Sequence, residues 1–370
     1  MSVLGTNPCK RILISATLYG AGGTETHLLN LSQLLVRHGA EVTVVVRYAN
    51  PETPLVKFCE RIPVRFLKTP FAGNLRLFRL STAWSVAAWP FQLPQRHFDV
   101  LYTFQVSRFT GFLARHVKRG GQLLWSIAGE PLIKAPKGYA NTSFLTGVIV
   151  ETEMQAEAAR SALNDNLPVG VIPLLGHVLK PPPRQPRLVH QIRITFLGRF
   201  HRQKGVYRLL DLWSELDIQP ARLDFYGHGE EGTALNREIQ RRGLSPQVRV
   251  NGPWSNPEEL SAILSETDLM VLPSETEGLP VVLLEAMAHG VPFVATDVGA
   301  VKTLAQDNPD VRVVALESEA LKGAIQELAH DIRGGCIRGD RLQQYHHAHY
   351  GYEALSERWL NALLNPERFW

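Results

Sequence analysis

Short apolar runs alternate with longer amphipathic segments along most of the chain. Strand-like runs at residues 11–15 and 41–46 flank a segment whose leucines recur at helical spacing between residues 28 and 35. The same alternation returns after residue 190. This pattern is typical of βαβ units with parallel sheets, so it predicts an α/β fold.

One expected helix has both of its ends marked in the sequence. Pro280 suits the first helical position, Gly290 is a natural C-terminal cap, and Pro292 prevents continuation. Almost every residue between them is apolar, so we expect a helix that is buried on most sides. Strand-like runs at 268–273 and 292–296 complete a strand–helix–strand unit.

Two carboxylates accompany this helix. Glu285 is a lone acid on the apolar helix, and burying it is costly unless a partner or a ligand hydroxyl binds it. Glu277 lies just before the helix, where free N–H groups and the helix dipole attract anions. Two carboxylates eight positions apart, flanking a helix start that attracts a phosphate, favour a sugar-nucleotide site. The alternative is an ordinary helix start followed by a solvated glutamate.

The Glu277-x7-Glu285 pair in this setting resembles the signature of the retaining GT-B glycosyltransferases of family 4. The resemblance extends over nearly the full length and implies two Rossmann-like domains whose parallel sheets face each other across a deep cleft. It implies that Glu277 binds hydroxyls of the donor sugar and Glu285 those of the ribose. The helix start at Gly278 and Leu279 would assist in holding the diphosphate.

A basic loop follows the strand-like run at 193–197. Arg199 and Lys204 look like the diphosphate-binding cations of the family. Two fixed cations stabilise the negative charge that develops on a leaving nucleoside diphosphate without a metal. A solvated basic loop is the alternative, and Arg202 is the residue of this cluster that we assign to solvent.

Glycine turns follow other predicted strands. Gly22 and Gly23 lie between the first strand and its helix, where glycine allows a close approach to a diphosphate or sugar. A merely tight turn is the alternative, because the dinucleotide-binding pattern is absent. Gly227 and Asn251 end two later strands, and the resemblance implies that these turns border the nucleotide base.

The first half departs from the family at one place. Many relatives carry a histidine facing the reacting sugar after the strand that corresponds to residues 122–127, whereas this chain has Ala128-Gly129-Glu130-Pro131. Glu130 is therefore a candidate on the acceptor side. Thr152 is a second candidate, since relatives usually carry Ser or Thr near the cleft there.

The length of 370 residues suits two domains. A proline-dense stretch lies almost at the centre, so we expect an acceptor-side domain at 1–177, a linker at 178–190 and a nucleotide-sugar-binding domain at 191–351. The resemblance implies that the final helical segment, 352–370, packs back on the first domain.

Three cysteines without metal-ligand spacing favour a reducing cytoplasm. No signal-peptide pattern opens the sequence, and no apolar run is long enough to span a bilayer. Three histidines at 346–349 lie in a polar stretch without accompanying carboxylates. We expect neither a metal site nor a cofactor.

Charge is spread unevenly. Residues 1–177 hold 18 Lys plus Arg against 10 Asp plus Glu, and the segment Arg61–Phe98 contains six basic residues and no acid. Aromatic residues are interleaved there: Phe66, Phe71, Phe78, Trp84, Trp89 and Phe91. This composition suits an interfacial segment on anionic lipid. Nucleic acid is the other usual partner of such a patch, but a sugar-nucleotide site favours a saccharide acceptor instead. A pair of core helices with solvated arginines is the alternative.

The sequence thus predicts a metal-independent, retaining glycosyltransferase. It would move a hexose from a UDP- or GDP-sugar to a glycan or glycolipid in bacterial surface polysaccharide or lipopolysaccharide synthesis. The protein would be cytoplasmic, at the inner face of the membrane. A sugar-nucleotide epimerase of the same fold and a non-catalytic nucleotide-sugar-binding protein are the alternatives.

Overall fold

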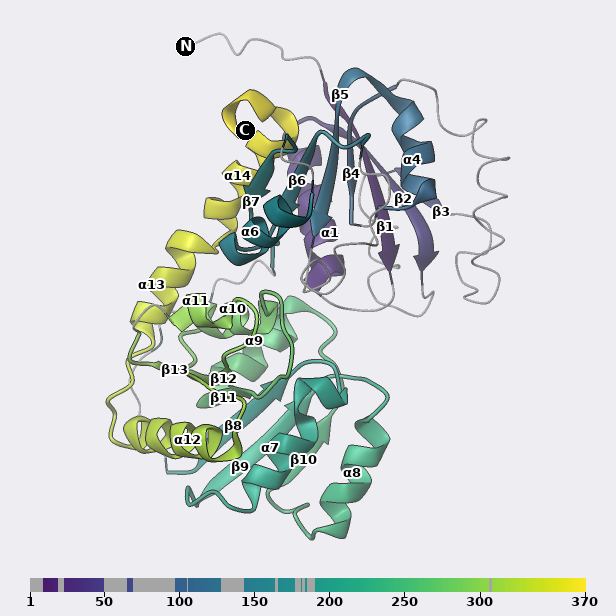
Figure 1. Cartoon of the computed structure of the whole chain (residues 1–370). Coiled ribbons are helices and arrows are strands. Elements are labelled where there is room, and N and C mark those ends of the chain that lie inside the picture. The colour runs from purple at the N-terminus through teal and green to yellow at the C-terminus, as the bar shows by residue number, and fades with distance from the viewer. Residues whose placement is uncertain are drawn as a thin grey trace. The chain divides into compact units, whose positions relative to one another are not determined.

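The computed structural model describes residues 9–18, 23–49, 65–68, 97–104, 106–127, 143–163, 166–176, 181, 184, 190–305 and 308–370. The chain forms two compact units (Figure 1). Unit 1 comprises Met1–Leu175 and Leu355–Trp370, and unit 2 comprises Gly176–Ala354. Unit 1 is therefore assembled from both ends of the sequence.

Unit 1 contains a parallel sheet with the strand order β3-β2-β1-β4-β5-β6-β7. Its strands are β1 (Arg11–Leu18), β2 (Glu41–Ala49), β3 (Arg65–Lys68), β4 (Phe98–Thr103), β5 (Val117–Ile127), β6 (Gly147–Val150) and β7 (Val169–Val171). Its helices are α1 (Gly23–Arg37), α4 (Arg108–Leu113), η2 (Ala114–His116), α6 (Glu153–Ala162), most of α14 (Tyr352–Leu364) and η4 (Pro366–Arg368). The direction of strand addition reverses between β1 and β4.

Unit 2 contains a second parallel sheet, with the order β10-β9-β8-β11-β12-β13. Its strands are β8 (Ile192–Leu197), β9 (Ala221–Tyr226), β10 (Val248–Asn251), β11 (Leu269–Leu272), β12 (Phe293–Thr296) and β13 (Val311–Val314). Its helices are η3 (Arg202–Lys204), α7 (Val206–Trp213), α8 (Gly232–Arg241), α9 (Pro257–Glu266), α10 (Val281–Ala288), α11 (Val301–Ala305), α12 (Ser318–Arg333) and α13 (Asp340–His349). Here the reversal lies between β8 and β11. The α/β fold class expected from the sequence is confirmed.

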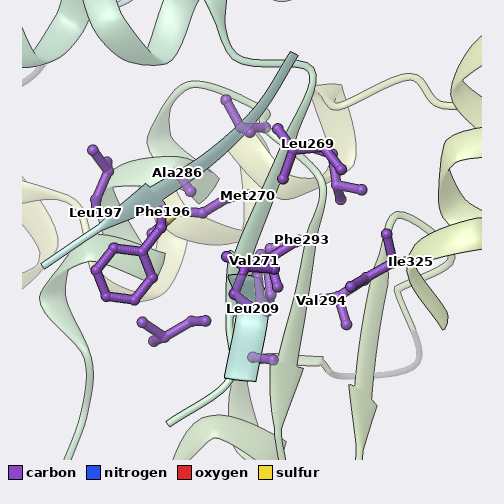
Figure 2. Close-up of a cluster of buried hydrophobic side chains, with 14 of the residues drawn as sticks. Phe196, Leu197, Leu209, Leu269, Met270, Val271, Ala286, Phe293, Val294 and Ile325 are labelled. Atoms are coloured by element: carbon purple, nitrogen blue, oxygen red, sulfur yellow. The ribbon is translucent and has the colours of Figure 1, made fainter. Parts of the chain in front are cut away.

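The core of unit 2 is built on strands that are buried along their whole length. Every residue of β11 and β12 is buried, as expected when helices cover both faces of a parallel sheet. Figure 2 shows side chains of β8, β11 and β12 together with Leu209 of α7, Ala286 of α10 and Ile325 of α12. This packing anchors the strand ends from which the loops of the candidate site extend.

The final residues of the chain pack on the first sheet. Trp359 of α14 is fully buried, and its indole N–H donates to the Pro173 carbonyl at 3.0 Å. Phe369 and Trp370 cover two glycines, because a Cβ at Gly147 would lie 2.6 Å from the Trp370 ring and one at Gly170 would lie 2.5 Å from the Phe369 ring. The terminal aromatic rings can therefore pack against β6 and β7 only because Gly147 and Gly170 have no side chain.

A buried histidine joins three parts of unit 1. Nδ1 of His27 accepts the Leu175 backbone N–H at 2.9 Å, so the ring proton is on Nε2, which lies 3.1 Å from the Tyr102 hydroxyl. The His27 ring also packs 4.6 Å from the Trp359 ring, between centroids. Burial lowers the pKa of His27 to about 3, so this histidine is neutral. His27 thus connects α1, β4 and α14 to the last residue of the first segment of unit 1.

Candidate functional site

The candidate site of unit 2 lies where the direction of strand addition reverses. Strands β8 and β11 are neighbours, and the chain goes on from β8 to β9 on one side before returning to β11 on the other. In open parallel sheets, ligands bind at the carboxyl ends of the two strands at such a point. Lys204 follows β8 and Glu277 follows β11, so the topology brings these two loops together.

Lys204 and Glu277 form an ion pair at this edge. Lys204 Nζ lies 2.7 Å from Glu277 Oε2 and donates to the Thr276 carbonyl at 3.3 Å. The side chains are 30% and 9% exposed, so the pair is largely shielded but reachable from solvent. Gly205 has φ +77°, and a Cβ there would lie 2.1 Å from the Pro273 carbonyl oxygen. Glycine is thus needed for the loop after β8 to approach the loop after β11.

The other carboxylate oxygen of Glu277 is also bound. Ser274 donates from its hydroxyl to Glu277 Oε1 at 2.7 Å. Ser274 is fully buried, and its own carbonyl accepts a hydrogen bond from the Thr296 hydroxyl at 2.5 Å. The sequence analysis did not identify Ser274. The available signal was its position three residues before Glu277 and two residues after the end of β11.

The backbone after Glu277 is fixed by the loop that follows β12. Ala300 donates its N–H to the Gly278 carbonyl at 3.0 Å, and Leu279 is buried in the core. Gly299 has φ +57°, and a Cβ there would lie 2.0 Å from the Glu277 carbonyl oxygen. The prediction that Pro280 occupies the first position of helix α10 differs from the structure by one residue, and Gly278 and Leu279 lie in the loop before the helix. The helix begins at Val281, and Pro280 is its N-cap with ψ 107°, an extended conformation.

Glu285 lies in the buried part of α10 and is 3% exposed. Its backbone carbonyl accepts the N–H of His289 at 3.2 Å, and Nδ1 of His289 lies 3.0 Å from the same oxygen. Gly290 has φ +63° and ends the helix as expected. The sequence therefore placed this carboxylate on the correct helix and in the correct degree of burial.

The three basic side chains of the loop after β8 lie in different environments. Arg199 is exposed and, within the described residues, forms no ion pair; its charge helps burial to lower the pKa of His228. Arg202 is 78% exposed, and its Nε donates to Glu231 Oε1 at 3.1 Å. Lys204 alone of the three contacts Glu277 in the described structure.

Two further predicted residues lie at the same edge of the sheet. Gly227 follows β9, and a Cβ there would lie 1.9 Å from the Gly198 carbonyl oxygen, so the turns after β8 and β9 are in close contact. Asn251 ends β10, next to Tyr226 in register. Its buried Nδ2 has no hydrogen-bond acceptor within the described part of the chain. The carboxyl ends of β8, β9 and β10 thus carry predicted donor-site residues side by side.

The predicted residues of unit 1 are described only in part. Gly23 is the first residue of α1, after β1, whereas Gly22 and Glu130 lie outside the described residues. Thr152 is the N-cap of α6 and accepts the Gln155 N–H at 3.2 Å, while Gln155 Oε1 accepts the Thr152 N–H at 3.1 Å. This reciprocal capping box is readable in the sequence as Thr-x-x-Gln, and the sequence analysis missed it.

The described residues contain neither a candidate metal cluster nor a helix suited to span a membrane. No group of three or more His, Cys, Asp or Glu side chains in the described ranges is placed to hold a metal ion. Within those ranges, no helix combines the length and the apolar character needed to cross a bilayer.

Comparison with known proteins finds a family match for part of unit 2. Residues 191–331 match the family described as Glycosyl transferases group 1. That range contains Arg199, Lys204, Glu277 and Glu285. The same segment of the chain thus carries both the family match and the ion pair at the reversal of strand order.

Two curated relatives agree with this match. The putative teichuronic acid biosynthesis glycosyltransferase TuaC of Bacillus subtilis is 31% identical over 137 residues, 37% of this chain and 33% of that protein. The amylovoran biosynthesis glycosyltransferase AmsD of Erwinia amylovora is 30% identical over 179 residues, 47% of this chain and 48% of that protein. The alignments thus span between a third and a half of these relatives.

Solved structures extend the likeness to the whole fold. HepE from Anabaena, solved in complex with UDP and glucose, matches with a TM-score of 0.71 and 17% identity, over 96% of this chain and 99% of that one. The two α/β units match the fold of the GT-B glycosyltransferase structures. At this identity the likeness shows the fold alone.

Proposed function

We propose that this protein is a glycosyltransferase that moves a hexose from a nucleoside-diphosphate sugar of the UDP or GDP type to a glycan or glycolipid. The observation that carries the proposal is the Lys204–Glu277 pair at the carboxyl ends of β8 and β11, within the range that matches Glycosyl transferases group 1. A cation beside a hydroxyl-binding carboxylate is the combination that a sugar diphosphate requires.

Each residue of unit 2 has a defined role in this proposal. Lys204 and Arg199 hold the diphosphate, and Glu277 accepts hydrogen bonds from hydroxyls of the donor sugar. Glu285 accepts them from the ribose. Backbone N–H groups at Gly278 and Leu279 assist in the loop before α10, and the turns at Gly227 and Asn251 border the base.

In unit 1, we assign Gly22 and Gly23 to donor binding and Glu130 and Thr152 to the acceptor. The Thr152 hydroxyl already accepts a hydrogen bond as the N-cap of α6. A contact of Thr152 with the acceptor would therefore use the hydroxyl proton or the second lone pair of the oxygen.

The proposed reaction retains the anomeric configuration and uses no metal ion. The leaving diphosphate and the attacking hydroxyl share one face of the sugar, and the diphosphate helps to deprotonate the acceptor. No enzymatic nucleophile is then required. The chain's own contribution is electrostatic, because Lys204 and Arg199 provide fixed positive charge where the leaving group gains negative charge.

The proposed acceptor belongs to bacterial surface polysaccharide or lipopolysaccharide synthesis. The biosynthetic glycosyltransferases TuaC and AmsD support this class. We further propose that the protein works in the cytoplasm, at the inner face of the membrane, through the basic and aromatic segment Arg61–Phe98. That segment lies outside the described residues except for the backbone of β3 and residues 97–98.

A panel of UDP- and GDP-hexoses tests the proposal. We expect slow release of UDP or GDP with one of them, and faster release once the acceptor is added. A changed sugar without release would identify an epimerase. Binding with neither release nor epimerisation would identify a binding protein.

Two variants connect that release to the ion pair. Lys204→Ala should lower the rate by about 10²–10³, the scale for the loss of one donor that stabilises developing charge. Arg202→Ala should change the rate much less, because Arg202 is exposed and pairs with Glu231. Equal, mild effects of both substitutions would contradict the assigned role of Lys204.

A further inference from the structure

The Glu277 carboxylate is held from two sides. Lys204 binds Oε2 at 2.7 Å, and the Ser274 hydroxyl donates to Oε1 at 2.7 Å. Lys204 has a long, flexible side chain whose ammonium ion would also interact with a diphosphate. Ser274 has a short side chain with a single χ1 angle, so its hydroxyl is the more rigid of the two donors.

Ser274 is itself anchored in the core of unit 2. It is fully buried, two residues after the end of β11. The Thr296 hydroxyl, at the end of β12, donates to the Ser274 carbonyl at 2.5 Å. The position of the Ser274 hydroxyl is thus set by two buried strands, and it does not depend on the exposed part of the loop.

We propose that Ser274 is the positioning residue of Glu277. Its hydrogen bond to Oε1 selects the side-chain rotamer that directs Oε2 to Lys204 in the unliganded protein. The same rotamer directs Oε2 to a donor-sugar hydroxyl during the reaction, and this second part rests on the proposed function. Ser274 acts through Glu277 and makes no contact with the sugar.

A crystal structure of unliganded Ser274→Ala tests the first part without any assay of activity. Removal of the hydroxyl should let the Glu277 side chain rotate away from its present rotamer. The 2.7 Å contact between Glu277 Oε2 and Lys204 Nζ would then be lost or present in only some conformers. Thr195→Val is the matched control, since Thr195 is a buried hydroxyl of the same sheet whose partner is Thr267. It should leave Glu277 in place. A Glu277 carboxylate that stays on Lys204 in Ser274→Ala would overturn the inference.

A double-mutant cycle tests the second part, using the UDP- or GDP-hexose that the wild type hydrolyses fastest. Ser274→Ala should lower kcat for release by about tenfold to hundredfold, the range for loss of a hydrogen bond to a charged group. In a Glu277→Ala background the same substitution should have no further effect, because Ser274 acts only through Glu277. Thr195→Val should have equal effects in both backgrounds.

The outcomes separate the two proposals. An equal loss from Ser274→Ala in both backgrounds would mean that Ser274 only supports the fold, which overturns its positioning role. A wild type that releases nucleoside diphosphate from none of the sugars would overturn the proposed function. The crystal structure of Ser274→Ala would then still decide whether Ser274 positions Glu277.

Discussion

At the scale of single residues, the charge of Lys204 is already matched before any ligand binds. Its ammonium group lies 2.7 Å from Glu277 Oε2, and Glu277 is 9% exposed. A diphosphate that binds Lys204 must therefore compete with a neighbouring carboxylate, which also repels it. Glu277 should favour the donor sugar and at the same time weaken binding of the sugar-free product.

This competition predicts the behaviour of Glu277→Gln. The amide keeps the shape of the side chain but removes its charge, so UDP or GDP should bind severalfold more tightly while turnover falls. Solvent-exposed ion pairs contribute on the order of 0.2–1 kcal/mol, and this more shielded pair should reach at least the upper part of that range. Isothermal titration calorimetry with UDP and GDP measures the change. Glu275→Gln is the control, because Glu275 pairs with Arg208 instead. Weaker binding of both nucleotides to Glu277→Gln would contradict the competition.

Sequence and structure agree unevenly for individual residues. The burial of Glu285 could be predicted from the sequence, because a single acid in an otherwise apolar helix must be buried with it. The hydrogen bond from Ser274 to Glu277 could not be derived, since it depends on side-chain rotamers and on the anchoring of Ser274 by a strand distant in sequence. The capping role of Thr152 was readable from Gln155 three residues later.

At the scale of elements, the loop before α10 is shaped by the loop before α11. The carbonyl oxygen of Glu277 occupies the place that a Cβ of residue 299 would need, at 2.0 Å. The loop conformation at Glu277 thus requires a glycine more than twenty residues later. The exact first residue of α10 could not be predicted from the sequence, because proline is compatible with both the N-cap and the first turn of a helix.

Gly299→Ala should therefore damage both stability and the site. A left-handed φ together with the clash should cost about 2 kcal/mol or more of the free energy of unfolding of unit 2. Chemical denaturation measures this cost, and titration with UDP or GDP measures the loss of binding. Gly323→Ala in the exposed face of α12 is the control; it meets nothing within 4 Å and should stabilise by about 0.5–1 kcal/mol. Equal stability of the two variants would refute the requirement.

At the scale of the whole molecule, the α/β alternation predicted the class of fold, and the order of strands in each sheet came only from the structure. The hydrophobic pattern identifies strands but not their neighbours, because parallel strands that are buried on both faces look alike in sequence. The reversal between β8 and β11, which brings Lys204 to Glu277, is a property of that order.

The buried His27 predicts how unit 1 responds to acid. Its pKa is lowered from 6.5 to about 3 in the folded protein, so between these values the unfolded chain binds a proton that the folded chain does not. The free energy of unfolding should therefore decrease as pH falls below 6.5, by up to about 1.4 kcal/mol per pH unit from this group. The destabilisation caused by His27→Gln should be largest near pH 8 and shrink towards pH 5 in denaturant titrations. His38→Gln, at an exposed histidine just after α1, is the matched control substitution. A pH-independent cost of His27→Gln would contradict the argument.

The segment Arg61–Phe98 predicts binding to anionic membranes. Six cations without an acid should contribute about 1 kcal/mol each near an anionic surface, and salt should screen this attraction. The protein should sediment with vesicles that contain phosphatidylserine at low ionic strength and dissociate as salt rises. Charge reversal at Arg76 and Arg79 should weaken sedimentation and leave donor hydrolysis intact. A wild type that ignores such vesicles at low salt would favour a soluble acceptor.

The division of unit 1 between the two ends of the sequence has a consequence for synthesis in the cell. A ribosome makes Met1–Leu175 first, then all of unit 2, and only then Leu355–Trp370. Until that last segment emerges, Trp359 is missing from its buried position beside His27, and the glycines of β6 and β7 lack their aromatic cover. Unit 2 can complete its sheet while unit 1 still lacks Leu355–Trp370. Unit 1, although its synthesis begins first, would therefore finish folding after unit 2. Chaperones would encounter incompletely folded unit 1 for longer than unit 2.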